Sequence, residues 1–168
     1  MRHLGSAPEM AIMKAVIASR TERSGDPQES RFRRILVGVK FSTEDEAVLA
    51  CAAELAIRCD ASLMLVHVVE PSFPRRTTGQ PPRETTRSGL EDYAEAKLEL
   101  STLGRQMLGK CRVVETSIRN GLAFFEITES AQALGADLIV IGAGGGYTSL
   151  SETAQKIIRH APCPVLVV

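Results

Sequence analysis

The sequence predicts a single α/β domain built on a parallel sheet with helices on both faces. Short continuous apolar runs recur along the chain, at Ile35–Val39, Leu63–Val69 and Leu138–Ile141. Segments with apolar residues at helical spacing separate these runs. Because parallel strands are buried on both faces, they read as continuous apolar runs, and the alternation with helices favours a doubly wound fold.

The composition is that of an ordinary globular domain. The chain has 168 residues, of which 44% are hydrophobic and 24% charged, so one core can form without disulfide or metal support. Lys and Arg number 20, as do Asp and Glu, which argues against nucleic acid or a membrane as partner. The four cysteines form no C-x-x-C pair. We therefore expect free thiols in a reducing, cytoplasmic compartment.

Two segments are expected to lie outside the regular structure. Residues 1–31 end in ASRTERSGDPQESR, a tract rich in charge, Ser, Gly and Pro, which favours a flexible N-terminal extension ahead of one domain over residues 32–168. The stretch from Pro71 to Ser88 has no apolar period and is predicted to be a long connection.

The first half of the domain is predicted as strand, helix, strand. The strand Ile35–Val39 is followed by Ser42-Thr43-Glu44-Asp45, residue types that favour a helix start. Apolar residues then recur at helical spacing between Ala47 and Ala56. The second strand, Leu63–Val69, is closed by Glu70 and a proline.

The next elements are predicted as helix, strand, helix. Leu90–Met107 and Phe124–Leu134 carry apolar residues at helical spacing. Between them, Val113–Ile118 has polar residues interleaved, which favours an exposed edge strand. Asn120-Gly121 is a turn signal.

The C-terminal segment is predicted as strand, glycine loop, helix and strand. Ser149-x-x-Glu152 fits a capping box for this last helix. The chain closes on Val165–Val168, an apolar strand expected at an edge of the sheet, where it invites pairing with another strand.

Right-handed crossovers leave few ways to order these strands. The order 3-2-1-4-5 places the switch point between the first and fourth strands, and ligands of open α/β sheets bind outside the carboxyl ends of strands at that point. The segments there are Val39–Ser42 and Gly142–Tyr147.

Three stretches of this chain resemble the universal stress protein family, the UspA-like domains. They are RRILVGVKFSTEDEAVLACAAELA, LMLVHVVEP and ADLIVIG…RHAPCPVLVV, and the resemblance extends from about Arg33 to Val168. It implies a cytoplasmic, stress-induced protein that acts by binding and is not an enzyme. It also implies a homodimer formed through the last strand, by Val165, Leu166, Val167 and Val168.

The family has nucleotide-binding and non-binding branches. The binding branch shows G-x-x-G, nine residues and G-[S/T] after the fourth strand, and an adenine-recognising aspartate after the first. Here Gly142 and Gly145 keep the first part, but Ser151 and Glu152 replace G-[S/T] after only five residues, and Lys40 replaces the aspartate. A side chain and a negative charge at the phosphate position disfavour ATP in the family's usual pose.

Other features favour a remnant site. The glycine run can form a nest of backbone amides, and Lys40 can meet an anion. The leading prediction is a dimeric stress-response module with a degenerate nucleotide pocket and an unidentified protein partner. The alternative is a sensor that binds ATP or another adenine nucleotide, with Mg, in an altered pose; an enzyme of a related fold is a third.

The candidate nucleotide-binding residues combine the two strand ends with the start of the last helix: Gly38, Val39, Lys40, Ser42, Val68, Gly142, Gly144, Gly145, Gly146, Ser151 and Thr153. No catalytic residue and no metal ligand is predicted. His67 is expected to be a packed, hydrogen-bonded side chain.

Overall fold

The computed structural model describes residues 31–70, 88–111, 114–144 and 149–168. The expected N-terminal extension and the connection between residues 71 and 88 lie almost wholly outside these ranges, as do Gly145 and Gly146. The domain boundary drawn at residue 32 stays a prediction.

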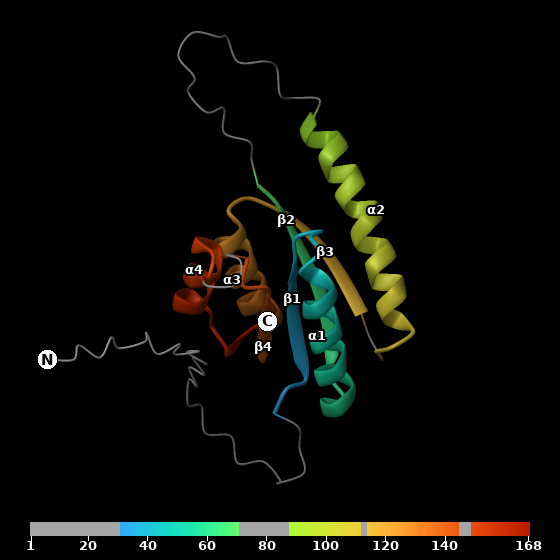
Figure 1. Ribbon diagram of the computed structural model, residues 1–168, viewed down its shortest axis with the longest axis vertical. Coiled ribbons are helices and arrows are strands. Elements are labelled where there is room, and N and C mark those ends of the chain that lie inside the picture. The colour runs from blue at the N-terminus through green and yellow to red at the C-terminus, as the bar shows by residue number, and fades with distance from the viewer. Residues whose placement is uncertain (1–30, 71–87, 112–113, 145–148) are drawn as a thin grey trace, which may run out of the picture.

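The fold is built on one sheet of five parallel strands in the order β3-β2-β1-β4-β5 (Figure 1). Along the chain the strands are β1 (Arg34–Val39), β2 (Ser62–Val69), β3 (Val114–Asn120), β4 (Leu138–Ile141) and β5 (Val165–Val167). The predicted fold class and strand order are confirmed, and β3 and β5 lie at the two edges, as expected.

Four helices cover the two faces of this sheet. They are α1 (Asp45–Cys59), α2 (Ser88–Leu108), α3 (Ala123–Leu134) and α4 (Glu152–His160). Figure 1 shows α1 and α2 on one side of the strands and α3 and α4 together on the other. No helix in the described parts of the chain is long and apolar enough to cross a membrane.

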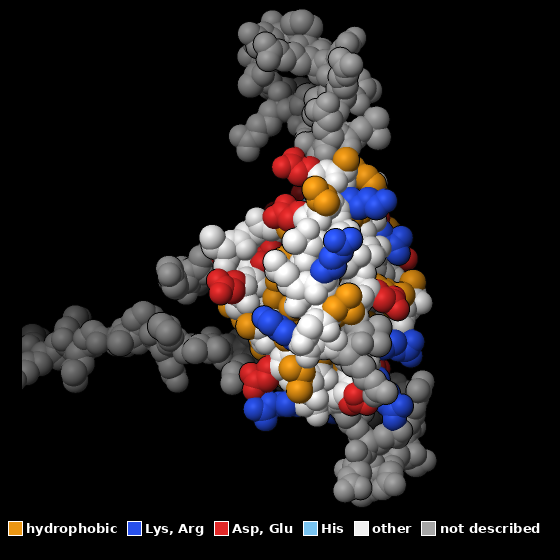
Figure 2. Space-filling model, turned by 90° about the vertical axis from the view of Figure 1, so that its right-hand side faces the viewer, with side chains coloured by type: hydrophobic (Ala, Val, Ile, Leu, Met, Phe, Trp, Pro, Cys, Tyr) orange, Lys and Arg blue, Asp and Glu red, His pale blue; other side chains and the backbone are white. Residues whose placement is uncertain are grey.

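On the side of the molecule that carries α2, charged side chains of both signs are mixed. Figure 2 views the side on which α2 lies, and there Lys and Arg are interspersed with Asp and Glu. This mixture agrees with the balanced totals of the sequence and leaves no strongly charged field on that side.

Alternate side chains of β1 supply the cores on the two faces. Ile35 and Val37 are buried against α1 and α2 in one apolar cluster, and Leu36 is buried against α3 and α4 in the other. Because side chains alternate along a strand, Gly38 continues the face that Leu36 begins, and a Cβ there would meet Ile127 of α3. Lys40 follows the end of β1, and its ammonium lies next to Gly144, on the side of Ser151 and the start of α4.

The start of α1 differs from the expected side-chain cap. The N-cap residue is Glu44, which makes no side-chain capping bond. Instead Asp45, only 7% exposed, accepts hydrogen bonds at Oδ2 from the backbone N–H groups of Lys40 and Ser42, at 3.0 and 3.1 Å. These bonds close the turn through Phe41, whose φ is 59°, and fix the backbone at the end of β1.

The strand β3 is longer than predicted. It continues past Ile118 because Arg119 and Asn120 remain in register with Val68 and Val69 of β2. Pairing with a neighbouring strand, which local sequence does not report, decides where this strand ends.

Candidate functional site

A cavity of about 330 Å³ lies at the carboxyl ends of the strands, between the first turns of α3 and α4. Its position is the switch point predicted from the strand order. Its lining residues come from β1, β2, β4 and the two helices: Gly38, Val39, Lys40, His67, Val68, Glu70, Ala123, Ile127, Ile141, Gly142, Ser151, Thr153, Ala154 and Ile157.

Most of the predicted nucleotide-binding residues lie in this lining. They are Gly38, Val39, Lys40, Val68, Gly142, Ser151 and Thr153. Ser42 is not among the lining residues; its N–H is used by Asp45 at the start of α1. Gly144 lies beside the cavity, next to the side chains of Lys40 and Ser151. The structure therefore brings together residues predicted from three separate segments of the chain.

Gly38 keeps the floor of the cavity open. A Cβ at this position would lie 3.1 Å from Cγ2 of Ile141 and 3.3 Å from Cδ1 of Ile127. Both distances are shorter than ordinary van der Waals contacts, so a side chain here would displace its neighbours and fill the floor. Val68 and Ile157 add apolar surface to the lining.

Lys40 is the one cation among the described residues that line the cavity. Its ammonium approaches Gly144 so closely that a Cβ there would collide with Nζ, and the same Cβ would lie 3.1 Å from Oγ of Ser151. The φ of Gly144 is 66°, a conformation that side chains disfavour. The missing side chain of Gly144 thus leaves a space that the Lys40 ammonium and the Ser151 hydroxyl both border.

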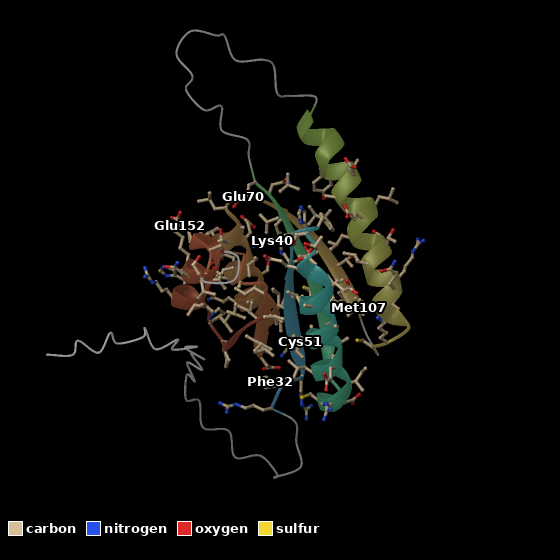
Figure 3. All side chains as sticks on the ribbon, in the orientation of Figure 1. Phe32, Lys40, Cys51, Glu70, Met107 and Glu152 are labelled. Carbon is tan, nitrogen blue, oxygen red and sulfur yellow. The ribbon has the colours of Figure 1, made fainter. Side chains whose placement is uncertain are left out.

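Glu70 lines the cavity on the side of α3. Its Oε1 accepts a hydrogen bond of 3.0 Å from the N–H of Ala123, the first residue of α3, and a carboxylate is favoured at the positive end of a helix. Figure 3 shows Glu70 and Lys40 at the same end of the sheet. Sequence reasoning missed Glu70, and an acidic residue directly after a buried strand was the available signal.

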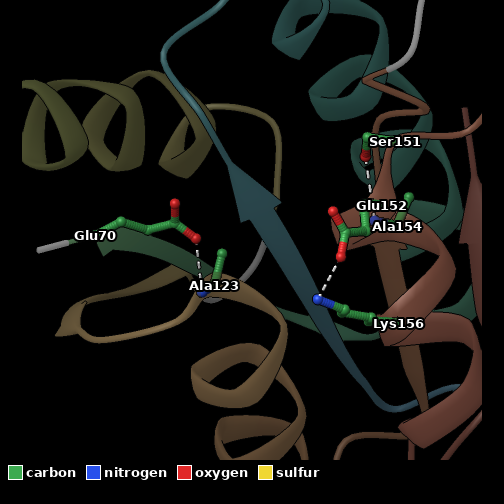
Figure 4. A network of polar contacts seen from close by, with 6 residues as sticks. All are labelled: Glu70, Ala123, Ser151, Glu152, Ala154 and Lys156. Atoms are coloured by element: carbon green, nitrogen blue, oxygen red, sulfur yellow. Dashed lines mark hydrogen bonds and ion pairs between the residues drawn. The ribbon is translucent and has the colours of Figure 1, made fainter. Parts of the chain in front are cut away.

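The first turn of α4 corrects two expectations. The N-cap is Ser151, whose Oγ accepts from the N–H of Ala154 at 3.1 Å, so the predicted capping box from Ser149 is wrong. Glu152 places no charge in the cavity, because its side chain is 83% exposed and pairs with Lys156 at 2.6 Å. That bond lowers the pKa of the Glu152 carboxyl. Figure 4 shows the caps of both helices.

His67 is packed and hydrogen-bonded, as predicted. Its Nδ1 lies 2.9 Å from the carbonyl oxygen of Val39, and its ring stacks against Phe41 with centroids 4.2 Å apart. Both contacts orient the imidazole as part of the wall between β1 and β2.

The described residues include no group of three or more His, Cys, Asp or Glu side chains that could hold a metal ion. A metal ion in the described part of the cavity would therefore be coordinated mainly by oxygen atoms of a bound ligand. The donors that the cavity offers are an ammonium, two hydroxyls and backbone amides, which suit an anion.

A doubly wound sheet with a cavity at its switch point defines a class of small ligand-binding α/β proteins. Within that class, the model of the universal stress protein family matches residues 31–168. The chain belongs to the universal stress protein family.

Relatives with known names or structures agree with this assignment. The chain is 30% identical to a universal stress protein of Synechocystis sp. over 82% of this chain and 85% of that protein. It resembles the structure of UspA from Lactobacillus plantarum with a TM-score of 0.69 and 28% identity, over 82% and 98% of the two chains. It also resembles a universal stress protein from Archaeoglobus fulgidus in complex with dAMP, with a TM-score of 0.59 and 25% identity, over 81% and 97%.

Proposed function

We propose that this protein is a cytoplasmic stress-response protein that acts by binding, and that its switch-point cavity holds an adenine nucleotide. The observation that carries the proposal is the cavity itself, whose lining combines apolar side chains with the polar side chains of Lys40, Ser151 and Thr153. Its volume of about 330 Å³ is at the lower end of the range for small-molecule sites.

The distribution of polar groups suits a base with a phosphate. Val68, Ile127 and Ile157 offer apolar surface on which a base can pack. Lys40 and Ser151 offer donors at the mouth of the cavity. The dAMP complex of the Archaeoglobus fulgidus relative supports an adenine nucleotide as the ligand of this chain.

The helix ends favour a short phosphate chain over a long one. The N–H of Ala154 is already bound by Ser151, and the N–H of Ala123 is bound by Glu70. Since free amide donors at a helix start hold phosphate, each cap removes one donor from its helix start. We propose a mononucleotide, with Mg playing no part in its retention.

The hydrogen bonds of Ser151 and His67 support binding without catalysis. In the described lining, Oγ of Ser151 accepts from Ala154, while Nδ1 of His67 lies against Val39. Nucleophilic catalysis requires a hydroxyl hydrogen-bonded to its base, and in the described lining the hydroxyl of Ser151 is not hydrogen-bonded to His67.

A second candidate is a dimeric module whose nucleotide pocket is degenerate. Edge strand β5 supports the dimer. The carbonyl of Pro164 and the N–H of Val168 bond to β4, so alternation along the strand leaves the N–H and C=O groups of Val165 and Val167 directed to the open edge. Open apolar edges pair readily, and we propose that a second copy pairs here.

Calorimetric titration of nucleotide-free protein with AMP and with ATP plus magnesium tests the proposal. We expect one AMP site per chain with a dissociation constant in the range of about 1–100 μM, and weaker binding of ATP. Folded protein that gives no heat with millimolar AMP or ATP would support the degenerate pocket instead. Sedimentation of the same samples decides separately whether the chain is a dimer.

A further inference from the structure

We infer that Lys40 is the specificity-determining residue of the cavity. Its ammonium binds the phosphate of the ligand and makes the site selective for a nucleoside monophosphate over both the nucleoside and the triphosphate. This inference rests on the proposed function, because it assigns the anionic end of the proposed ligand to one side chain.

Hydrogen bonds to Asp45 fix the backbone at Lys40. Asp45 accepts the N–H groups of Lys40 and Ser42, which fixes the turn that follows β1. The Lys40 side chain extends toward the start of α4, where Gly144 provides the space that Nζ enters. These contacts fix the backbone of Lys40, and they use none of the hydrogen-bond donors of its ammonium.

No described carboxylate is paired with this ammonium. The other charge in the lining is Glu70, and its Oε1 is bonded to Ala123. Glu152 pairs with Lys156 outside the cavity. A cation at a cavity mouth without a partner is a ready site for an anion, since a charge-assisted hydrogen bond is about twice as strong as a neutral one.

Ser151 completes the anion site. Its Oγ accepts from Ala154, and a hydroxyl that accepts can still donate its own proton. Oγ and the Lys40 ammonium both border Gly144, and the positive end of α4 lies at the same place. One phosphate can therefore meet an ammonium and a hydroxyl together. Further phosphates find no second cation in the described lining, where the other charge is the carboxylate of Glu70.

The test compares adenosine, AMP and ATP on four proteins by calorimetry: the wild type, Lys40→Met, Lys40→Arg and Lys97→Met. Lys97 is exposed on α2, on the other face of the sheet, so its substitution makes the same change in net charge away from the cavity. We expect Lys40→Met to lower the AMP-to-adenosine affinity ratio by about tenfold or more. Lys40→Arg and Lys97→Met keep the ratio within about threefold of wild type.

The outcomes separate the inference from the proposed function. If AMP binds the wild type and Lys40→Met leaves the ratio unchanged, the inference is overturned and the function stands. If neither adenosine nor AMP binds, the proposed function fails. Inorganic phosphate titrated into wild type and Lys40→Met then tests the phosphate contact by itself: loss of binding in the variant supports a phosphate site at Lys40, and equal binding, or none in the wild type, overturns it.

Discussion

Glu70 at the end of β2 accepts a hydrogen bond from the backbone N–H of Ala123, the first residue of α3, at 3.0 Å. The carboxylate thereby caps a helix that begins 53 residues later in the chain. The contact ties the strand to the helix on one side of the cavity, and Ser151 gives α4 the corresponding cap on the other side (Figure 4). Both walls of the cavity thus depend on helix capping.

Removal of the Glu70 carboxylate is expected to destabilise the domain. Glu70→Ala leaves the N–H of Ala123 without its acceptor, and loss of a cap costs about 1 kcal/mol of the free energy of unfolding. Glu70→Gln keeps an acceptor oxygen and should lose less than half as much. Urea unfolding followed by circular dichroism measures both. Equal losses in the two variants would show that the charge, not the hydrogen bond, stabilises α3.

Two substitutions of Ser151 distinguish its effect on the stability of α4 from its effect on phosphate binding. Ser151→Ala should lower the free energy of unfolding by about 1 kcal/mol, whereas Ser151→Gly costs only a few tenths. The glycine variant also frees the N–H of Ala154 for a ligand. Because both ligands lose the hydroxyl and the freed N–H can serve a longer phosphate chain, we expect Ser151→Gly to raise the ATP-to-AMP affinity ratio above that of wild type, measured by calorimetry. An unchanged ratio in a folded Ser151→Gly protein would contradict this role for the cap.

Filling the floor of the cavity should abolish nucleotide binding. Gly38→Val places a side chain against Ile141 and Ile127, which already approach the position of its Cβ to 3.1 and 3.3 Å. Overpacking of this kind costs about 1–3 kcal/mol. Gly109→Val is the control, because a Cβ there meets only the carbonyl of Gln106 at 3.8 Å. AMP binding by folded Gly38→Val at wild-type affinity would exclude this cavity as the site.

The thiol of Cys163 is expected to react slowly with alkylating reagents. Burial, and secondarily the carboxylate of Asp137, raises the pKa of Cys163 to about 11. At pH 8 its reaction with iodoacetamide should be up to about a hundredfold slower than in urea-unfolded protein, since only the thiolate reacts. Peptide mass spectrometry measures the two rates, and equal rates would contradict a raised pKa.

The same raised pKa has a consequence for stability. A folded-state pKa above the unfolded value means that the native protein holds the proton of Cys163 more tightly. This contribution to the free energy of unfolding is complete below a pH of about 8.5 and is lost as the pH rises toward 11. Cys163→Ser should flatten that part of the pH profile in urea unfolding.

The outward N–H of Val167 tests the proposed dimer. Val167→Pro removes this donor while leaving the bonds of Val168 to β4 in place. Val167→Ala removes a similar apolar contact and keeps the donor. We expect the proline variant alone to raise the dimer dissociation constant, by about tenfold, in sedimentation equilibrium. The same constant in both variants would remove the β5 edge from the interface.

Local pattern predicted most elements well where apolar periodicity was strong. The strand Leu138–Ile141 was predicted at its observed limits. The predicted limits were wrong where contacts between distant parts of the chain set the end of a strand or the start of a helix. The end of β3 depends on pairing with β2, and the cap of α4 is Ser151 because the N–H of Ser151 bonds to Ala143, which sets where the loop joins the helix.

The candidate site divides in the same way. Strand order alone located the switch point, so Lys40, Gly142 and Ser151 could be predicted to lie near one another. Glu152 and Glu70 could not be assigned from sequence, because each carboxylate is placed by a partner, Lys156 for one and Ala123 for the other.

The sequence by itself determined the class of fold, the order of the strands and the family, because apolar runs and helical periodicity record which faces must be buried. Only the tertiary structure decided which charges face the cavity. Lys40 is turned toward it and Glu152 away from it, since the direction of a side chain depends on the register of its strand, the start of its helix and the partners it meets across the fold.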